Sequence, residues 1–188
     1  MRFRLRFVTS NRHKFNEAKE ILEKFNIELI HIPIDTAEIQ SDDIVEVVIY
    51  KAVEASKIVD PPFVVEDTGL YIEALKGFPG VFASYIYKTI GLEGVLKLLD
   101  GVGDRRAKFV AVGALMFDDN VFKIFRHDVA GHISTCIKGD GGFGYDPIFI
   151  PEGETRSFAE MSIEEKGIYS HRGGLFRKIG EFIRLLTK

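Results

Sequence analysis

Alternating polar and apolar residues open the chain and give way to a helical period. Residues 4–9 alternate and predict a β-strand. Ser10 and Asn11 follow, and their side-chain oxygens can accept the unpaired backbone N–H groups at the start of a helix. Residues 27–32, which are rich in isoleucine and leucine and are followed by Pro33, predict a second strand. The helix between the strands is indicated by apolar residues at helical spacing: Phe15, Ala18, Ile21, Leu22 and Phe25.

The next segment repeats this order with a second helix and a short strand. Ser41-Asp42 can cap a helix that runs to about Val59. Pro61-Pro62 then interrupts the chain, and residues 63–65 predict a short buried strand. The first third of the chain therefore alternates between strands and helices.

Apolar runs dominate the middle of the sequence. Residues 92–99 are helical in pattern. Residues 107–117 and 121–125 are apolar runs joined by Asp118-Asp119-Asn120, which predicts a turn between two antiparallel strands. Residues 148–150 predict one further strand.

The last part of the chain is helical, and its pattern completes the prediction of the fold. Residues 162–165 match the capping box that begins a helix. Helices interleaved with strands, followed by a hairpin, predict an α/β fold with a mixed sheet. We expect the final helix to pack on this sheet through one apolar stripe: Leu175, Ile179, Phe182, Ile183 and Leu186.

Length and composition favour one globular domain over residues 1–188, with room for two lobes. The chain has 188 residues of which 46% are hydrophobic, enough for one sizeable core. A net charge of -3 gives no general attraction for a polyanion, so we expect no nucleic-acid partner. The alternating start does not resemble a signal peptide, and no apolar run approaches the length of about 20 residues that crosses a bilayer. We expect a cytoplasmic protein without a membrane partner.

Two adjacent carboxylates follow the short strand at residues 63–65. Ligands of open α/β sheets collect at the carboxyl ends of strands, and Glu66-Asp67 stands at such an end. Carboxylate oxygens can bind a hard divalent cation while Gly69, after Thr68, turns the backbone away. The alternative is a polar turn without a function, since these residue types are common in turns.

Basic residues suited to phosphate occur in two places. The junction Thr9-Ser10-Asn11-Arg12-His13-Lys14 combines side-chain donors with the exposed N–H groups and positive end of a helix, although it lacks the glycines of a Walker A loop. Lys51 follows Val47 and Val48 by four and three residues and so lies on or beside the apolar face of its helix. Such a lysine either extends its ammonium to solvent or meets an anion.

A glycine-rich loop is the most unusual segment. Residues 139–147 place four glycines around Phe143 and Tyr145, which permits close approach to a flat ligand and stacking on a base. Lys166 and Ser170-His171-Arg172 add donors, which suit the 6-oxo group of a purine better than the amino group of adenine. A tight loop with its aromatic side chains in the core, and a solvated helix start, are the alternatives.

Taken in this order, the segments resemble the inosine triphosphate pyrophosphatase family over nearly the whole chain. The resemblance implies an elongated mixed sheet flanked by helices, with two lobes and an active-site cleft between them, usually in a homodimer. It also implies Mg²⁺-dependent hydrolysis of ITP, dITP and XTP to the monophosphate and pyrophosphate. The motifs that carry it are Thr9–Lys14, Glu66-Asp67-Thr68-Gly69-Leu70 with Gly77-Phe78-Pro79-Gly80, Gly142–Pro147, and Ala159-Glu160-Met161 through Glu165-Lys166 to Ser170-His171-Arg172.

The resemblance also implies a role for each site residue. Asp67 matches the catalytic carboxylate, and Glu38 matches the acidic residue that joins it at the metal. Thr68 would touch the substrate, and whether Glu66 contacts the metal directly or through water stays open. The triphosphate would be bound by Thr9, Ser10, Asn11, Arg12, His13, Lys14 and Lys51. The base would be surrounded by Phe143, Asp146, Lys166, His171 and Arg172, with Gly144 and Tyr145 in the same loop.

Two other functions are compatible with parts of this sequence. A Maf-type pyrophosphatase acting on pyrimidine nucleotides has a related fold, but the His171-Arg172 pair and the Phe143 loop argue against it. A nucleotide sensor could bind ITP without turning it over. The presence of both Asp67 and Glu38 favours catalysis, because a sensor needs no carboxylate to activate water.

Overall fold

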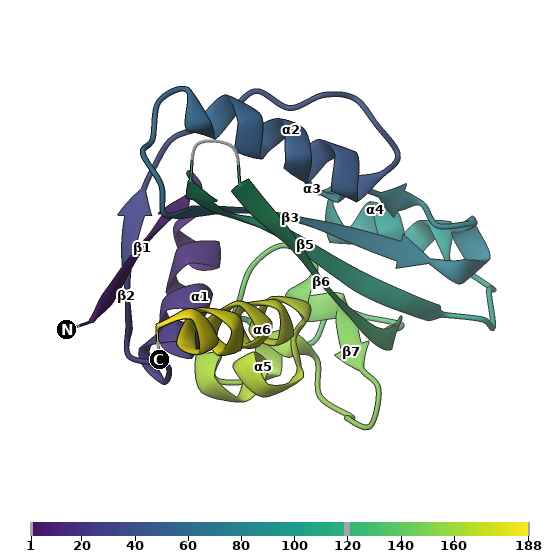
Figure 1. Cartoon of the computed structure of the whole chain (residues 1–188). Coiled ribbons are helices and arrows are strands. Elements are labelled where there is room, and N and C mark those ends of the chain that lie inside the picture. Colours follow the sequence, from purple (N-terminus) through teal and green to yellow (C-terminus); the bar gives the residue numbers. More distant parts are fainter. Residues whose placement is uncertain (1, 119–120, 188) are drawn as a thin grey trace. The chain divides into compact units, whose positions relative to one another are not determined.

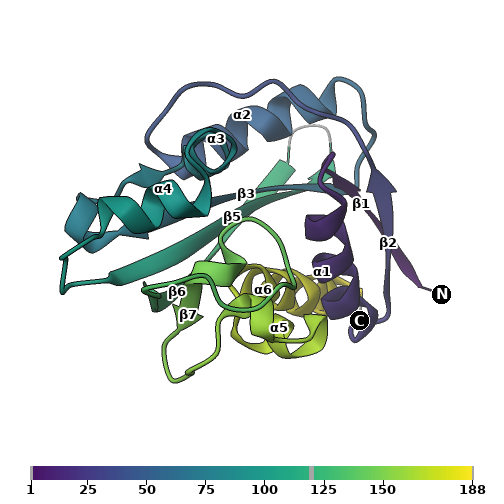
Figure 2. The same ribbon diagram turned by 180° about the vertical axis from the view of Figure 1, so that it is seen from behind.

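A mixed α/β fold is present, as the sequence predicts (Figures 1 and 2). The computed structural model describes residues 2–118 and 121–187. Within these ranges seven strands have the order β2-β1-β3-β5-β6-β7, with β4 paired to β3. The strands are β1 (Phe3–Val8), β2 (Ile27–Ile32), β3 (Phe63–Ile72), β4 (Pro79–Gly80), β5 (Arg106–Asp118), β6 (Val121–Ile133) and β7 (Phe149–Pro151). The α-helices are α1 (Arg12–Glu23), α2 (Ile44–Ser56), α3 (Ala83–Thr89), α4 (Gly91–Leu98), α5 (Ile163–Tyr169) and α6 (His171–Leu186).

The chain divides into two compact units. Unit 1 contains Met1–Asp67, Ala111–His127 and Arg172–Lys188. Unit 2 contains Thr68–Val110 and Asp128–His171. Across the described ranges, no helix is long and apolar enough to span a lipid bilayer.

Unit 1 is built on parallel strands with helices on both faces. β1 pairs in parallel with β2 from Phe3↔Ile27 to Val8↔Ile32, and with β3 at Phe7↔Val64. α2 lies along one face of these strands, and α1 and α6 lie along the other (Figures 1 and 2). The α1 and α6 face holds the core of the unit, which includes Leu5, Phe7, Ala18, Ile21, Leu22, Val64, Leu175, Phe176, Ile179 and Ile183.

Unit 2 is built on antiparallel pairs. β4 pairs with the end of β3 at Leu70↔Gly80, and β7 pairs with the end of β6 at Ile133↔Phe149. Its core is rich in aromatic side chains: Leu70, Ile72, Val95, Leu99, Phe109, Ile133, Tyr145, Ile148, Phe149 and Phe158. These residues come from strands, α4 and the loops before α5, so the glycine-rich loop is anchored in this core.

The first elements agree closely with the sequence. Asn11 is the N-cap of α1, and its Oδ1 accepts hydrogen bonds from the backbone N–H groups of His13 and Lys14 at 2.9 and 3.2 Å. β2 occupies the predicted residues 27–32. α2 begins slightly later than predicted, since Asp43 is its N-cap and Ser41 accepts from the N–H of Asp43 instead.

The prediction that β3 ends before Glu66 is wrong. β3 continues to Ile72, so the sequence Glu66-Asp67-Thr68-Gly69 lies inside a strand and not in a turn. β1 pairs with β3 at Phe63 and Val64, β4 pairs with it at Leu70 and Tyr71, and β5 is its other neighbour in the sheet. Gly69 has a different role from the one expected: a Cβ there would lie 2.7 Å from Cε2 of Tyr71, so the glycine makes room for that ring.

The later elements are longer or more numerous than predicted. β5 and β6 are neighbours that end and begin at Asp118 and Val121, too close in sequence for the crossover that parallel strands need, so the predicted hairpin is present. The central residues of its predicted turn, 119 and 120, lie outside the described ranges. α3 was not predicted, because its short sequence has no clear apolar period. The capping box at residues 162–165 is confirmed.

The burial of individual residues on α6 predicts which of its leucines stabilise the fold. Leu175 is fully buried in the core of unit 1. Leu186 is 59% exposed and lies outside that core, so the prediction that it packs on the sheet is wrong. Leu175→Ala should lower the free energy of unfolding by about 2–5 kcal/mol, because it removes buried methyl groups and leaves a cavity. Leu186→Ala is the matched control and should change it by less than about 0.5 kcal/mol. Urea unfolding followed by circular dichroism measures both, and equal losses would contradict this packing.

Candidate active site

The junction between β1 and α1 forms an ordered loop in unit 1. The Asn11 backbone N–H donates to Oγ1 of Thr9 at 3.2 Å, and the Thr9 carbonyl lies 2.8 Å from Nε2 of His31. Arg12 and His13, in the first turn of α1, are exposed. The junction is therefore held in place by backbone and amide contacts while charged side chains remain at the surface.

Lys14 joins this junction to the acidic pair on β3, Glu66 and Asp67. Its Nζ lies 2.9 Å from Oε2 of Glu66 and 3.5 Å from Oδ1 of Asp67. Glu66 is buried on the face of β3 that packs on α1 and α6, because it is two residues from Val64 and successive side chains of a strand alternate. Asp67 is only partly buried. The ammonium of Lys14 therefore contacts carboxylates at two successive positions of the strand.

A buried arginine completes the charges on the α1 and α6 face. Nη2 of Arg172 lies 3.1 Å from Oε1 of Glu66, and Nη1 lies 2.7 Å from Oε2 of Glu17. The side chains of Arg172 and Glu66 are 2% and 0% exposed. Burying a carboxylate without a counter-charge is costly, so these contacts are a condition for Glu66 to be charged at this position.

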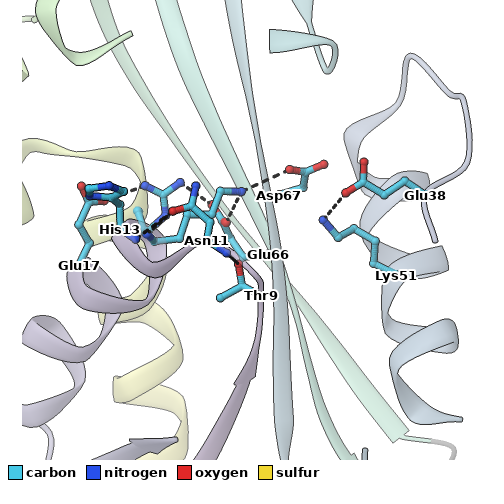
Figure 3. A network of polar contacts seen from close by, with 10 residues as sticks. Thr9, Asn11, His13, Glu17, Glu38, Lys51, Glu66 and Asp67 are labelled. Atoms are coloured by element: carbon cyan, nitrogen blue, oxygen red, sulfur yellow. Dashed lines mark hydrogen bonds and ion pairs between the residues drawn. The ribbon is translucent and has the colours of Figure 1, made fainter. Parts of the chain in front are cut away.

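A second lysine and carboxylate lie on the other side of β3. Nζ of Lys51 on α2 lies 2.7 Å from Oε1 of Glu38, and Figure 3 shows this pair across β3 from Glu17 and Asn11. Burial favours a lower pKa for Lys51, but the negative charges of Asp67, Glu38 and Glu66 outweigh it and leave the pKa raised. Lys51 therefore stays charged at neutral pH. Of the two alternatives from the sequence, extension to solvent or contact with an anion, the structure shows the contact with an anion, Glu38.

The carboxylates near Lys51 suit a hard cation that is bound partly by the protein and partly by a substrate. No three His, Cys, Asp or Glu side chains of the described residues are grouped as a complete metal site. Glu38 and Asp67 supply carboxylate oxygens that both act on Lys51. Mg²⁺ is typically held by one or two protein carboxylates together with water and substrate phosphates, so this pair fits Mg²⁺ better than a metal that needs a closed protein cage.

The glycine-rich loop lies in unit 2 and is closed around Asp146. The backbone N–H of Phe143 donates to Oδ2 of Asp146 at 2.7 Å, and Nζ of Lys166 lies 2.5 Å from the same oxygen. The ammonium of Lys166 also lies over the ring of Phe143, 4.7 Å from its centroid. Asp146 and Lys166 are both buried. Phe143 is half-buried, so its ring can offer surface to a flat ligand.

Two aromatic side chains of this region pack in the core of unit 2. The hydroxyl of Tyr145 donates to the carbonyl of Ala83 at 2.9 Å, and burial raises the pKa of that hydroxyl. His171 is buried and stacks on Phe109 with ring centroids 4.3 Å apart. The interpretation of Tyr145 as a stacking partner for a base is replaced by a packing role, which leaves Phe143 for stacking.

The predicted site residues divide between the two units. Unit 1 contains the junction Thr9–Lys14, Glu38, Lys51, Asp67 and Arg172, and charge contacts link Lys14 with Asp67 and Lys51 with Glu38. Unit 2 contains Thr68, the Phe143–Asp146 loop, Lys166 and His171.

One residue of the unit 1 network was missed from the sequence. Glu17 was not assigned a role, yet it is the partner of Arg172. The available signal was its position: Glu17 lies four residues before Ile21 and beside Ala18, on the apolar face of α1. A carboxylate on a buried helical face needs a cation nearby.

Comparison with known proteins gives matches over almost the full length. The sequence model of the Ham1 family matches residues 5–182. A dITP/XTP pyrophosphatase of Saccharolobus solfataricus is 50% identical over 182 residues, which cover 96% of this chain and 94% of that protein. A dITP/XTP pyrophosphatase of Thermococcus kodakarensis is 47% identical, with coverage of 96% and 97%.

Solved structures agree with these matches. The Ham1 protein of Staphylococcus aureus has a TM-score of 0.81 and 30% identity, covering 97% of this chain and 99% of that chain. A HAM1 protein from Coxiella burnetii has a TM-score of 0.82 and 31% identity, with coverage of 96% and 98%.

The loop geometry predicts unequal effects for two neighbouring glycines. Gly142 and Gly144 both have positive φ, but a Cβ on Gly142 would lie 2.2 Å from Oδ2 of Asp146, whereas one on Gly144 meets nothing within 4 Å. Gly144→Ala should cost about 1 kcal/mol of stability from its backbone conformation alone. Gly142→Ala should cost at least about 1 kcal/mol more, because it also displaces Asp146 from the Phe143 N–H. Thermal unfolding tests this, and a Gly142→Ala variant as stable as Gly144→Ala would refute the close approach.

Proposed function

The chain belongs to the Ham1 family, and from this premise we propose that it hydrolyses non-canonical purine nucleoside triphosphates such as ITP, dITP and XTP to the monophosphate and pyrophosphate. Relatives that are 50% and 47% identical over 96% of the chain are named dITP/XTP pyrophosphatases. Membership of this family also decides against the Maf-type alternative.

The single observation that carries the proposal is the set of charges around β3 in unit 1. Two ammonium groups, on Lys14 and Lys51, are held near the carboxylates of Asp67 and Glu38. Phosphoanhydride hydrolysis needs cations to neutralise the phosphates and a carboxylate to orient water, and little covalent participation by the protein. This set contains both kinds of group.

Mg²⁺ is the proposed cofactor, held by Asp67 and Glu38 together with the substrate phosphates. When bound, it neutralises charge on the phosphate oxygens and makes the phosphorus more open to attack. The ammonium groups of Lys14 and Lys51 and the donors of Thr9–Lys14 bind the remaining phosphate oxygens.

Asp67 orients the attacking water and accepts a proton from it. The water oxygen forms a bond to the α-phosphorus while the bond from that phosphorus to the bridging oxygen breaks. The bridging oxygen leaves with the β-phosphate, so the products are a nucleoside monophosphate and intact pyrophosphate. The donors that hold the β- and γ-phosphates stabilise the charge that develops on this leaving group.

Recognition of the base is assigned, by the resemblance to the inosine triphosphate pyrophosphatase family, to Phe143, Asp146, Lys166, His171 and Arg172. Phe143 offers its half-buried ring for stacking, with Lys166 and Asp146 fixing the loop around it. His171 and Arg172 donate toward the 6-oxo group that hypoxanthine and xanthine share. Adenine presents an amino group at that position, which would place donors against donors.

The proposal also covers the domain organisation, the oligomeric state and the cellular location of the protein. We propose that residues 1–188 work as one pyrophosphatase domain, with the active site in a cleft, in a cytoplasmic homodimer. The cleft and the homodimer follow from the resemblance to the inosine triphosphate pyrophosphatase family, and the single domain follows from the length and composition of the chain. The partner is a small nucleotide, in keeping with the net charge of -3.

Pyrophosphate release from a panel of ITP, dITP, XTP, GTP, ATP and CTP tests the function. With Mg²⁺, we expect ITP and XTP to exceed ATP by roughly 10⁴-fold in kcat/KM, as other sites that read hydrogen bonds discriminate. GTP should also be poor, and EDTA should abolish release. Tight binding of ITP without pyrophosphate release would instead identify a sensor.

Asp67→Asn separates catalysis from binding. The amide keeps the shape of the side chain but cannot take a proton from water, so kcat for ITP should fall by at least about 100-fold. Binding of the monophosphate product, measured by calorimetry, should change much less. Turnover at the parental rate in this variant would remove Asp67 from the catalytic step.

A further inference from the structure

Glu66 connects two cations through its two carboxylate oxygens. Oε1 lies 3.1 Å from Nη2 of Arg172, and Oε2 lies 2.9 Å from Nζ of Lys14. The side chain of Glu66 is 0% exposed, although it lies next to the partly exposed Asp67. Its burial and its two cationic contacts place the carboxylate of Glu66 in the protein interior and not on a surface that faces substrate.

Arg172, which contacts Glu66, is itself held by a second carboxylate. Arg172 lies in the first turn of α6, and its other contact is to Oε2 of Glu17 on α1 at 2.7 Å. Glu17 stands three residues after Lys14 on the same helix. The guanidinium therefore ties α6, α1 and β3 together, and a planar group with two carboxylate partners leaves little freedom in any of them.

Lys14 gains a defined position from this arrangement. A lysine side chain loses conformational entropy when it is fixed, so an ammonium that is held in place before substrate arrives binds phosphate at a smaller entropic cost. The contact with Glu66 holds the ammonium beside Asp67, 3.5 Å from Oδ1. No other carboxylate contact of Lys14 in the described part of the chain is as short as that to Glu66.

We propose that Glu66 is a positioning residue, held by Arg172 and Glu17, that sets the Lys14 ammonium beside Asp67 for triphosphate binding, and that it does not ligate the metal. This inference rests on the proposed function, since it assigns Lys14 to the substrate. It answers the question that the sequence left open about Glu66. Mg²⁺ in proteins usually keeps several waters, whereas the carboxylate of Glu66 has no exposed surface and contacts a cationic side chain through each oxygen.

A double-variant cycle on kcat/KM for ITP tests whether Glu66 acts through Lys14. Lys14→Met should reduce kcat/KM by about 100-fold, since it removes a charge that binds phosphate. Glu66→Gln should reduce it by about 10-fold, because an amide can accept from only one of the two cations. If Glu66 works through Lys14, the double variant should match Lys14→Met within a factor of about three.

Two further variants make the cycle specific. Glu66→Asp keeps the charge and should recover most of the activity lost in Glu66→Gln. Glu20→Gln is the control on α1, because its carboxylate only pairs with Lys24 at the surface, and its kcat/KM should equal that of the parent. All measurements are made at a temperature where circular dichroism shows each variant folded.

If the two single losses of kcat/KM multiply, giving about a 1,000-fold loss in the double variant, the proposal is overturned, because a metal ligand acts independently of Lys14.

A second cycle, on the unfolding midpoint of the substrate-free protein, does not depend on the reaction. The loss of Tm in the double variant should be smaller than the sum of the two single losses. Additive losses would overturn the contact itself, even if the parent protein proved to have another activity.

Discussion

The burial of Glu66 is the constraint on which the site of unit 1 depends. A carboxylate with no exposed surface is stable as an anion only where cations meet it, and here Arg172 and Lys14 do so from α6 and α1. Glu17 supplies the second negative charge that the buried guanidinium needs. These contacts join α1 and α6 to β3 beside the Thr9–Lys14 junction, to which Lys14 itself belongs.

The alternation of β3 then distributes the chemistry over two faces. Glu66 faces α1 and α6, whereas Asp67 acts on Lys51 of α2. Lys14 of α1 and Lys51 of α2, from helices on opposite faces, therefore both interact with the adjacent carboxylates Glu66 and Asp67. A turn at this point, as the sequence suggested, would give no such separation. The regular strand explains how the buried Glu66 can contact cations on one face while its neighbour Asp67 remains partly exposed.

The sequence was a good guide where local signals are strong and a poor one where distant residues decide. Asn11 as N-cap and β2 at residues 27–32 followed from capping chemistry and apolar pattern. The extension of β3 depends on its neighbours in the sheet, β1, β4 and β5, which no local pattern contains. Arg172 and Glu17 are 155 residues apart, and neither sequence neighbourhood announces the other. Tyr145 could stack on a base or pack in a core by composition, and only its hydrogen bond to Ala83 distinguishes the two.

Hydrolysis of ITP in water enriched in ¹⁸O tests the central claim most directly, namely that Asp67 and the lysines around β3 direct water to the α-phosphorus. After a single turnover, mass spectrometry of the products locates the new oxygen. The account predicts ¹⁸O in the phosphate of IMP and unlabelled pyrophosphate. Label in pyrophosphate, or in orthophosphate released together with IDP, would show attack at a different phosphorus and contradict it.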